Sequence, residues 1–126
     1  AFAYSSINEI EFSENSNLKI IDESAFSYSL INDITIPESV QKIEAIAFYS
    51  CPKLSHLEFS NNSKLTILGQ YTFSETILNS ISIPPKITQI ESCLFLNSIE
   101  FSKDSELTSI SKESFTNTAL ESLSLP

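Results

Sequence analysis

The chain has 126 residues, of which 41% are hydrophobic, and it carries a formal net charge of −9 without a single arginine. This length fits one domain, and an acidic chain without arginine lacks the basic surface that binds nucleic acids or anionic membranes. No apolar run approaches the roughly 20 residues of a membrane-spanning helix, and the N-terminus shows no secretion signal. We therefore expect neither nucleic-acid binding nor direct membrane insertion.

One short pattern, hydrophobic-x-x-Ile-x-Ile/Phe with conservative replacements, recurs six times along the chain. The copies are residues 7–12, 31–36, 54–59, 78–83, 96–101 and 120–125. Apolar and polar residues alternate within each copy, which predicts a β-strand with one buried face. The fourth residue of successive copies falls at 10, 34, 57, 81, 99 and 123. A period in the twenties predicts a solenoid of stacked coils, not a globule around a pocket.

A second half follows each predicted strand, with the pattern hydrophobic-x-x-Ile, four residues and then Phe. The second halves are residues 18–26, 40–48, 65–73, 87–95 and 107–115, and Phe2 ends an earlier coil. The recurring Phe should lie at the far side of each coil and stack on the Phe of its neighbours. A core spine explains this column better than a binding site for an aromatic ligand does.

Two kinds of coil alternate along the chain. In one kind the strand ends in Phe-Ser and a longer polar turn follows, at 12–17, 59–64 and 101–106. In the other the strand ends in Ile-Pro and the turn is two residues shorter, at 36–39 and 83–86; Leu125-Pro126 begins a third. Proline has no N–H for a ladder, so it ends strand pairing. The true unit is a pair of coils, 47 residues long, as the steps 10→57 and 34→81 show.

The pattern Val40-x-x-Ile43-x-x-x-x-Phe48-x-x-Cys51-x-x-Leu54-x-x-Leu57 closely resembles the signature of BspA-like leucine-rich repeats. The resemblance covers the whole chain. It implies an α/β-type leucine-rich repeat solenoid that is strand-dominated with little helix. The expected shape is a curved right-handed array of about five to six coils with a parallel sheet on the concave face. The chain departs from the family in its second halves, which usually contain Ile-Gly; only Leu68-Gly69 keeps the glycine.

Members of this family are large surface or secreted proteins of mucosal bacteria and of protist parasites such as trichomonads, linked to adhesion and host-protein binding. The resemblance therefore implies a protein-interaction module at the cell surface or outside the cell. Its partner would be a protein of the host extracellular matrix or cell surface. One alternative is a structural spacer that holds a distal region away from the cell. Another is a parallel β-helix of the carbohydrate-lyase kind, which would need three strands per coil.

The outward strand positions would line the concave face of such a repeat and form the candidate binding face. They are Glu9, Glu11, Asp33, Thr35, His56, Glu58, Ser80, Ser82 and Glu100. Glutamate recurs on every second strand, at Glu11, Glu58 and Glu100, which doubles the distance between like charges. Solubility and charge spacing alone would explain this column. As a recognition surface, the face would gain affinity from many repeats.

The sequence predicts no catalytic residue, metal or cofactor. His56 is the single histidine, and no serine or cysteine has a nucleophile motif around it. Phosphate loops and zinc-ligand spacings are missing. Asp33, His56 and Glu58 would approach one another on neighbouring strands and mimic part of a triad or a weak metal site, although a plain surface histidine is the simpler interpretation.

Two cysteines and one sequon complete the candidate sites. Cys51 and Cys93 lie two coils apart, which is roughly 10 Å at a stacking distance of ~4.8 Å and beyond the ~7 Å Cα reach of a disulfide. We expect both to be free and packed. The sequence Asn61-Asn62-Ser63 is an N-glycosylation sequon in a predicted turn, and its use is left open.

Residues 1–126 form a single array, which we interpret as a fragment of a longer solenoid because neither end resembles a polar cap. Uncapped ends predict end-to-end self-association. The coil near residues 95–97 is irregular, since nothing separates Phe95 from Leu96 where other coils have four or five residues. Either the chain crosses directly and kinks the solenoid, or residues are missing from the sequence there. The register of both flanks favours missing residues.

Overall fold

The computed structural model describes residues 1–91, 96–116, 118, 120–121 and 123–126. Within these ranges the chain forms nine β-strands and no helix, so no helix there is suited to crossing a membrane. The strands are β1 (Ile20–Ile21), β2 (Asp33–Ile36), β3 (Lys42–Ile43), β4 (His56–Phe59), β5 (Ile67–Leu68), β6 (Ser80–Ile83), β7 (Gln89–Ile90), β8 (Ser98–Phe101) and β9 (Ser109–Ile110).

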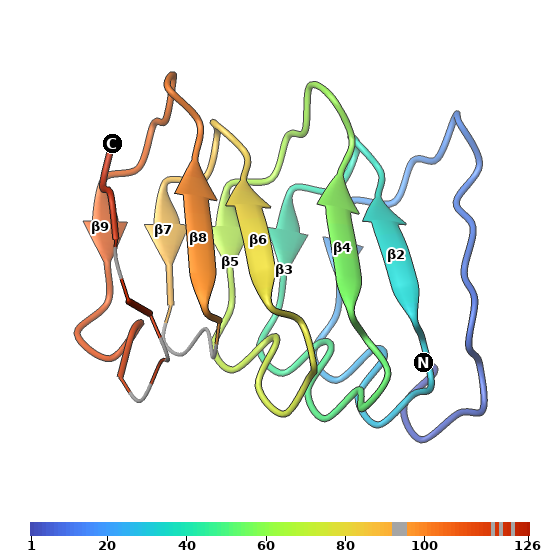
Figure 1. The fold of residues 1–126 in the computed structure, drawn as a ribbon. Helices are drawn as coiled ribbons and strands as arrows, with labels where there is room; N and C mark the ends of the chain where they lie inside the picture. Colours follow the sequence, from blue (N-terminus) through green and yellow to red (C-terminus); the bar gives the residue numbers. More distant parts are fainter. Residues whose placement is uncertain (92–95, 117, 119, 122) are drawn as a thin grey trace.

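Long and short strands alternate along the chain and gather on opposite sides of the molecule (Figure 1). The two-residue strands form one five-stranded parallel sheet in the order β1-β3-β5-β7-β9. The four-residue strands β2, β4, β6 and β8 lie on the other side, which we call the strand face. The array makes about four turns. The predicted strand-dominated solenoid is therefore confirmed, with two strands in each full turn in place of the three that a carbohydrate-lyase β-helix requires.

The short strands were not predicted as strands. Their sequences, such as Lys42-Ile43 and Ile67-Leu68, offer only two residues between turns. An isolated pair of residues shows no alternation, so periodicity cannot reveal it. The ladder becomes visible only when the coils are stacked, since Ile43 lies opposite Leu68 and Leu68 opposite Ile90.

The short coil keeps both ladders in register. Ser80 of β6 lies opposite Ser98 of β8, and Gln89 of β7 lies opposite Ser109 of β9. The shortening therefore falls between β7 and β8, where residues 92–95 are outside the described part of the chain. Whether the chain crosses there directly or lacks residues stays a prediction.

The sequence pattern predicts one strand too many at each end of the array. Residues 7–12 and the described part of 120–125 form no strand, so these two predictions are wrong. Residues 7–12 are hydrogen-bonded to the next coil at their start, where the Ile7 carbonyl accepts from the Leu30 N–H at 3.0 Å and the Asn8 carbonyl from the Asn32 N–H at 3.1 Å. Ile10 and Phe12 also pack against the core. The segment follows the path of the solenoid without a continuous ladder.

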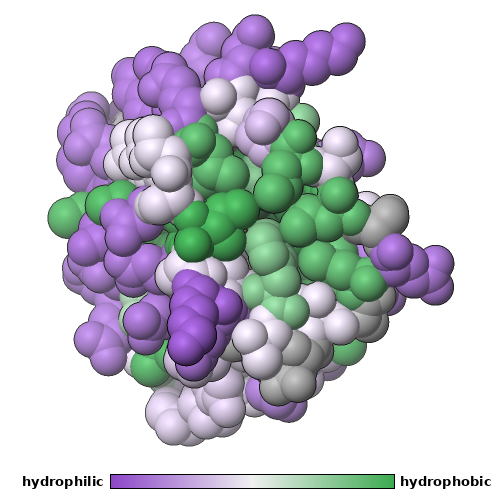
Figure 2. Space-filling model, turned by 90° about the vertical axis from the view of Figure 1, so that its left-hand side faces the viewer, coloured by the Kyte–Doolittle hydropathy of each residue, from purple (hydrophilic) through white to green (hydrophobic). Residues whose placement is uncertain are grey.

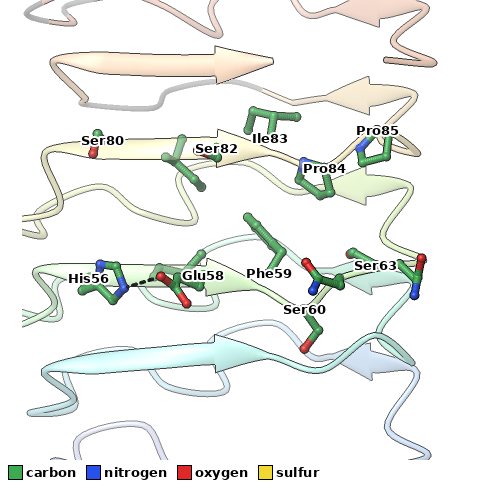
Figure 3. A pocket seen from close by; sticks show the side chains of 14 residues that line it. His56, Glu58, Phe59, Ser60, Ser63, Ser80, Ser82, Ile83, Pro84 and Pro85 are labelled. Carbon is green, nitrogen blue, oxygen red and sulfur yellow. Dashed lines mark ion pairs between the residues drawn. The ribbon is translucent and has the colours of Figure 1, made fainter. Parts of the chain in front are cut away.

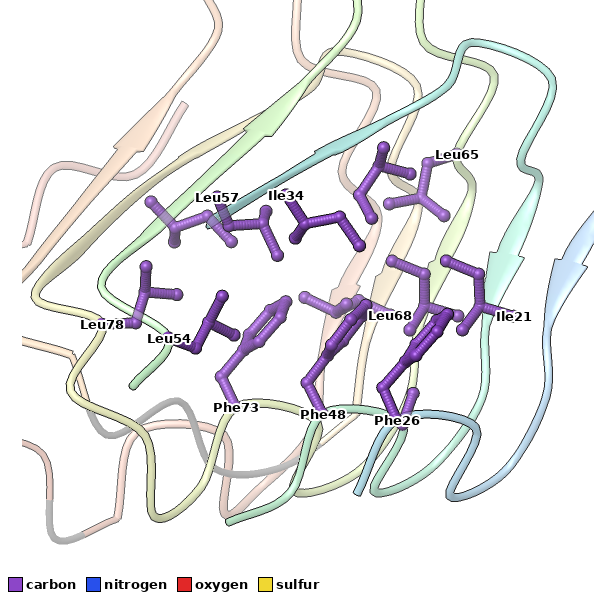
Figure 4. Packing of buried hydrophobic residues seen from close by; sticks show 14 of the residues in the cluster. Ile21, Phe26, Ile34, Phe48, Leu54, Leu57, Leu65, Leu68, Phe73 and Leu78 are labelled. Carbon is purple, nitrogen blue, oxygen red and sulfur yellow. The ribbon is translucent and has the colours of Figure 1, made fainter. Parts of the chain in front are cut away.

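The core runs through the interior of the coils (Figure 4). Ile34 and Leu57 enter it from the strand face, and Leu68 enters from the short strands. The predicted phenylalanine spine is confirmed for four rings. Their centroids are 5.6 Å apart for Phe2–Phe26, 5.2 Å for Phe26–Phe48 and 5.9 Å for Phe48–Phe73, and all three pairs are stacked. Phe95 lies outside the described residues, and Phe115 packs against the core while half-buried.

The turns on the spine side repeatedly use left-handed backbone. Ser24 and Ile46 have φ of 57° and 51° three positions after a buried strand residue, and Ser50 and Glu75 have φ of 52° and 58° two positions after a spine Phe. None of these residues is glycine, although glycine meets such angles at the lowest cost. The fold therefore sets these turns against local preference.

Candidate functional site

All nine predicted face residues are exposed on the strand-face side of the molecule. The exposed–buried alternation within β2, β4 and β6 turns Thr35, Glu58 and Ser82 outward while their neighbours enter the core. Glu9 and Glu11 stand on the segment that precedes β2, and Glu100 stands on β8.

The ladders bring several of these side chains next to one another. Asp33 lies opposite His56 and Thr35 opposite Glu58 in the β2–β4 ladder, and Ser82 lies opposite Glu100 in the β6–β8 ladder. The Ser82 hydroxyl donates to Glu100 Oε2 at 3.4 Å. These pairings alternate carboxylates with neutral groups across each ladder, which limits repulsion between like charges.

His56 pairs with the carboxylate of its own strand. Its Nε2 is 3.0 Å from Glu58 Oε1, and the two side chains are 62% and 63% exposed. Such an exposed pair contributes little stability. Asp33 is a register neighbour of His56. Among the described residues no three His, Cys, Asp or Glu side chains are arranged to hold a metal ion.

The strand face is interrupted at every second step. β2 pairs with β4 and β6 pairs with β8, but β4 and β6 belong to separate sheets. Figure 3 shows the wider separation between β4 and β6, with Phe59 lying between the two strands. A groove of about 550 Å³ occupies this step. We call it the central groove; it is lined by residues 56–63 and 80–85.

A proline removes one hydrogen bond at this step. In the β2–β4 ladder Ile36 lies opposite Phe59, and the next residue, Ser60, donates its N–H to the Ile36 carbonyl at 3.0 Å. One coil later the corresponding position is Pro84, which has no N–H to donate toward Phe59. The bond that closes the ladder between β2 and β4 is therefore unavailable between β4 and β6.

The same arrangement recurs on both sides of the central groove. The N-terminal groove, of about 570 Å³, lies between residues 9–14 and β2, where Pro37 takes the place of Pro84. A C-terminal groove of about 400 Å³ lies between residues 99–103 and 124–126, with Pro126 in that place. Each open step joins a Phe-Ser coil to a following Ile-Pro coil. The two-coil unit predicted from the sequence is thus a structural unit of one ladder step and one open step.

The grooves differ in charge. Acidic side chains dominate the N-terminal groove, which is lined by Glu9, Glu11, Glu14, Asp33 and Glu38. Lys64 reaches this set, with its Nζ 3.4 Å from Glu38 Oε1. In the central groove the acidic residue is Glu58, and in the C-terminal groove Glu100 lies with Lys103. The strand face is therefore most negative toward β2.

A tyrosine cluster flanks the phenylalanine spine and was not singled out by the repeat pattern. Tyr4 stacks on Tyr28 with centroids 4.5 Å apart, and Tyr49 meets Tyr28 edge-on at 5.6 Å. Burial within this cluster, followed by the charges of Tyr4 and Tyr49, raises the pKa of Tyr28. The tyrosines occupy offsets of one or two from the spine residue, so no single repeat position reveals them.

Cys51 is buried in the core with a free thiol. Its Sγ donates to the Phe26 carbonyl at 3.1 Å and lies 3.5 Å from the Ser29 hydroxyl. Burial raises the pKa of this thiol. Cys93 lies outside the described residues, so the prediction that the two cysteines are unpaired is untested.

In the sequon Asn61 is exposed and Ser63 is buried, and its glycosylation stays an open question.

Stacked parallel coils with two strands each, a buried spine and a polar strand face define a leucine-rich-repeat scaffold. A model of the BspA type leucine rich repeat region matches residues 1–121 in six copies, and the chain belongs to this family. The crystal structure of the pneumococcal vaccine antigen PcpA is similar, with 28% sequence identity and a TM-score of 0.77. The match covers 82% of this chain and 27% of the PcpA chain. No curated protein matches the chain.

Proposed function

We propose that this chain is a protein-binding segment of a surface-exposed or secreted protein, and that its strand face contacts proteins of the host cell or extracellular matrix. The observation that carries the proposal is the strand face itself, where nine polar side chains point outward and open steps interrupt the ladders. Scaffolds of this family are typically binding surfaces without catalysis. The similarity to a vaccine antigen supports a location outside the cell.

A spacer is the second candidate, and the charge pattern favours it. Glu58 lies opposite the neutral Thr35, and Glu100 lies opposite the neutral Ser82. A surface selected only for solubility would show the same spacing of carboxylates. A spacer function predicts that the identity of these side chains does not affect binding to any partner.

Binding to a panel of purified extracellular-matrix proteins and to epithelial cells separates the two functions. The test variant combines Glu11→Lys, His56→Ala and Glu58→Lys on the strand face. The matched control combines Asp22→Lys, Gln70→Ala and Glu23→Lys, which make the same change in charge at exposed positions beside the short strands. Binding that is lost only in the test variant supports the strand face. Binding that is absent, or equal in both variants, contradicts it.

End-to-end self-association is a separate proposal. Figure 2 shows hydrophobic side chains gathered at the end of the stack that contains β9. Leu123 and Leu125 are 38% and 56% exposed in this part of the chain. Sedimentation velocity over a rising protein concentration tests the proposal, and a monomer at every concentration would contradict it.

A further inference from the structure

The three open steps share one set of side chains. Each groove is lined by a glutamate, the phenylalanine that follows it and a proline from the next coil: Glu11, Phe12 and Pro37; Glu58, Phe59 and Pro84; Glu100, Phe101 and Pro126. The ladder steps differ, because Ile36 and Ile83 end their strands as buried side chains. A carboxylate beside a half-buried aromatic ring thus recurs once in every two-coil unit.

The shared set combines an apolar wall with a negative charge. Phe12, Phe59 and Phe101 are each half-buried, so part of each ring faces its groove. In the central groove the half-buried Pro85 lines the groove together with Phe59, whereas Ile83 and Pro84 are buried. Aromatic-lined grooves of this kind suit the rings of an extended, proline-rich peptide, which enters a groove with little loss of conformational entropy.

The charge of the chain selects a cationic partner. The net charge is −9, and each groove is lined by at least one exposed glutamate as well as by its phenylalanine. Lysine or arginine side chains of a partner would complement these carboxylates, whereas acidic partners would be repelled.

The spacing of the grooves selects the conformation of that partner. Successive grooves lie two coils apart, which is at least about 10 Å, because one step is a ladder step at the usual strand spacing and the other is the wider open step. A polyproline-II segment repeats every three residues, or about 9.3 Å, and keeps every third side chain on one side. A β-strand instead turns residues three apart to opposite faces. Of these two extended conformations, only polyproline II places every third side chain of the peptide on the same side, at a spacing close to that of the grooves.

We propose that the strand face docks an extended proline-rich peptide in the polyproline-II conformation, with a lysine or arginine at every third residue. The basic side chains meet Glu11, Glu58 and Glu100 in turn, while the prolines between them pack on the adjacent phenylalanines. This inference rests on the proposed binding function of the strand face and names the chemistry of its partner.

Fluorescence-labelled peptides of about 15 residues, long enough to span the three grooves, test the proposal by polarisation at low salt. The probe is a Pro-Pro-Lys repeat. One comparison peptide has the same composition with irregular lysine spacing, and a Gly-Ser-Lys repeat keeps the spacing without the polyproline-II conformation. We expect the probe to bind about tenfold more tightly than either comparison peptide, as three exposed ion pairs held in register allow. Equal binding of all three peptides, or no binding, overturns the proposal.

Two variants assign the binding to the grooves. Combined Glu11→Gln, Glu58→Gln and Glu100→Gln should weaken probe binding about tenfold, whereas combined Asp22→Asn, Glu23→Gln and Glu75→Gln, with the same change in charge at exposed positions outside the grooves, should leave it unchanged. Phe59→Leu keeps an apolar side chain and should reduce the preference for the Pro-Pro-Lys probe over the Gly-Ser-Lys repeat. Equal effects of the two triple variants would contradict groove binding. If matrix proteins bind the strand face without any preference for the probe, this inference fails while the proposed function stands; if neither binds, both fail.

Discussion

Gly69 lies so close to the coil before it that a Cβ atom at this position would be 2.6 Å from the Ala45 backbone nitrogen. The Gly69 N–H also donates to the Ile43 carbonyl at 2.9 Å, which extends the ladder of the short strands by one bond. The single glycine of the chain is therefore required for close approach between neighbouring coils.

Gly69→Ala should lower the free energy of unfolding by about 2–3 kcal/mol, because the added methyl group meets backbone atoms that must shift. Urea unfolding followed by circular dichroism measures this loss. The neighbouring Gln70→Ala, at an exposed side chain, should change stability by less than about 0.5 kcal/mol. Equal free energies of unfolding for the two variants would show that neighbouring coils can move apart to admit the methyl group without loss of stability.

Glu75→Asn should raise the free energy of unfolding by about 0.5–1 kcal/mol, because Glu75 has φ of 58° and asparagine adopts left-handed backbone more readily. The Glu75 side chain is exposed, so little packing is lost. Glu75→Val should have the opposite effect, since branching at Cβ clashes in this conformation. Thermal unfolding ranks the stabilities of the two variants. A valine variant that is more stable than the asparagine variant would contradict the expectation.

Phe48→Leu should destabilise the chain by about 1–2 kcal/mol, because Phe48 is fully buried and stacks between Phe26 and Phe73. Phe2→Leu is the matched substitution in the same spine. Phe2 is 45% exposed and stacks on Phe26, so its loss should be less than half as large. Comparable losses, measured by urea unfolding, would mean that stacking within the spine contributes little.

The Cys51 thiol gives stability a pH dependence. Burial raises its pKa above the usual 9.0 in the folded chain, so the unfolded chain releases this proton first as the pH rises. The neutral thiol therefore stabilises the fold below pH 9, and this contribution declines as the pH rises through the higher folded pKa. In a Cys93→Ser background, the stability of the Cys51 chain should fall faster above pH 9 than that of Cys51→Ala.

A thiol reagent reports the same burial. At pH 8 the native Cys93→Ser variant should react slowly, because the Cys51 thiol is buried and protonated. In urea it should react at the rate of an unfolded peptide. A fast reaction of the native chain would contradict the buried position of Cys51.

The repeat pattern was enough to predict the solenoid, the buried spine and the outward direction of the nine face residues. These features depend only on the type of each residue and its position in the repeat. The apolar Phe48 is thereby assigned to the core and the charged Glu58 to the surface. The pattern also located the alternation of Phe-Ser and Ile-Pro coils.

The grooves could not be predicted in the same way, because they depend on a contact between coils. Pro84 ends its own strand as expected, since β6 stops at Ile83, and it also provides no N–H for the Phe59 carbonyl one coil earlier. The unpaired segment 7–12 likewise precedes a coil whose strand ends in a proline, Pro37. Short strands such as Lys42-Ile43 could not be predicted for a related reason. A two-residue strand is recognised only by its pairing with the strands of the neighbouring coils.

The two sides of the solenoid should respond differently to mechanical load. The sheet of short strands is continuous from β1 to β9, whereas the strand face has no ladder between β4 and β6. Under tension along the stacking axis, separation at that step would break hydrogen bonds on one side only, while separation between β2 and β4 would break them on both. The chain should therefore bend and yield first at its prolines, and a longer array would stretch as a series of stiff two-coil blocks joined by softer hinges.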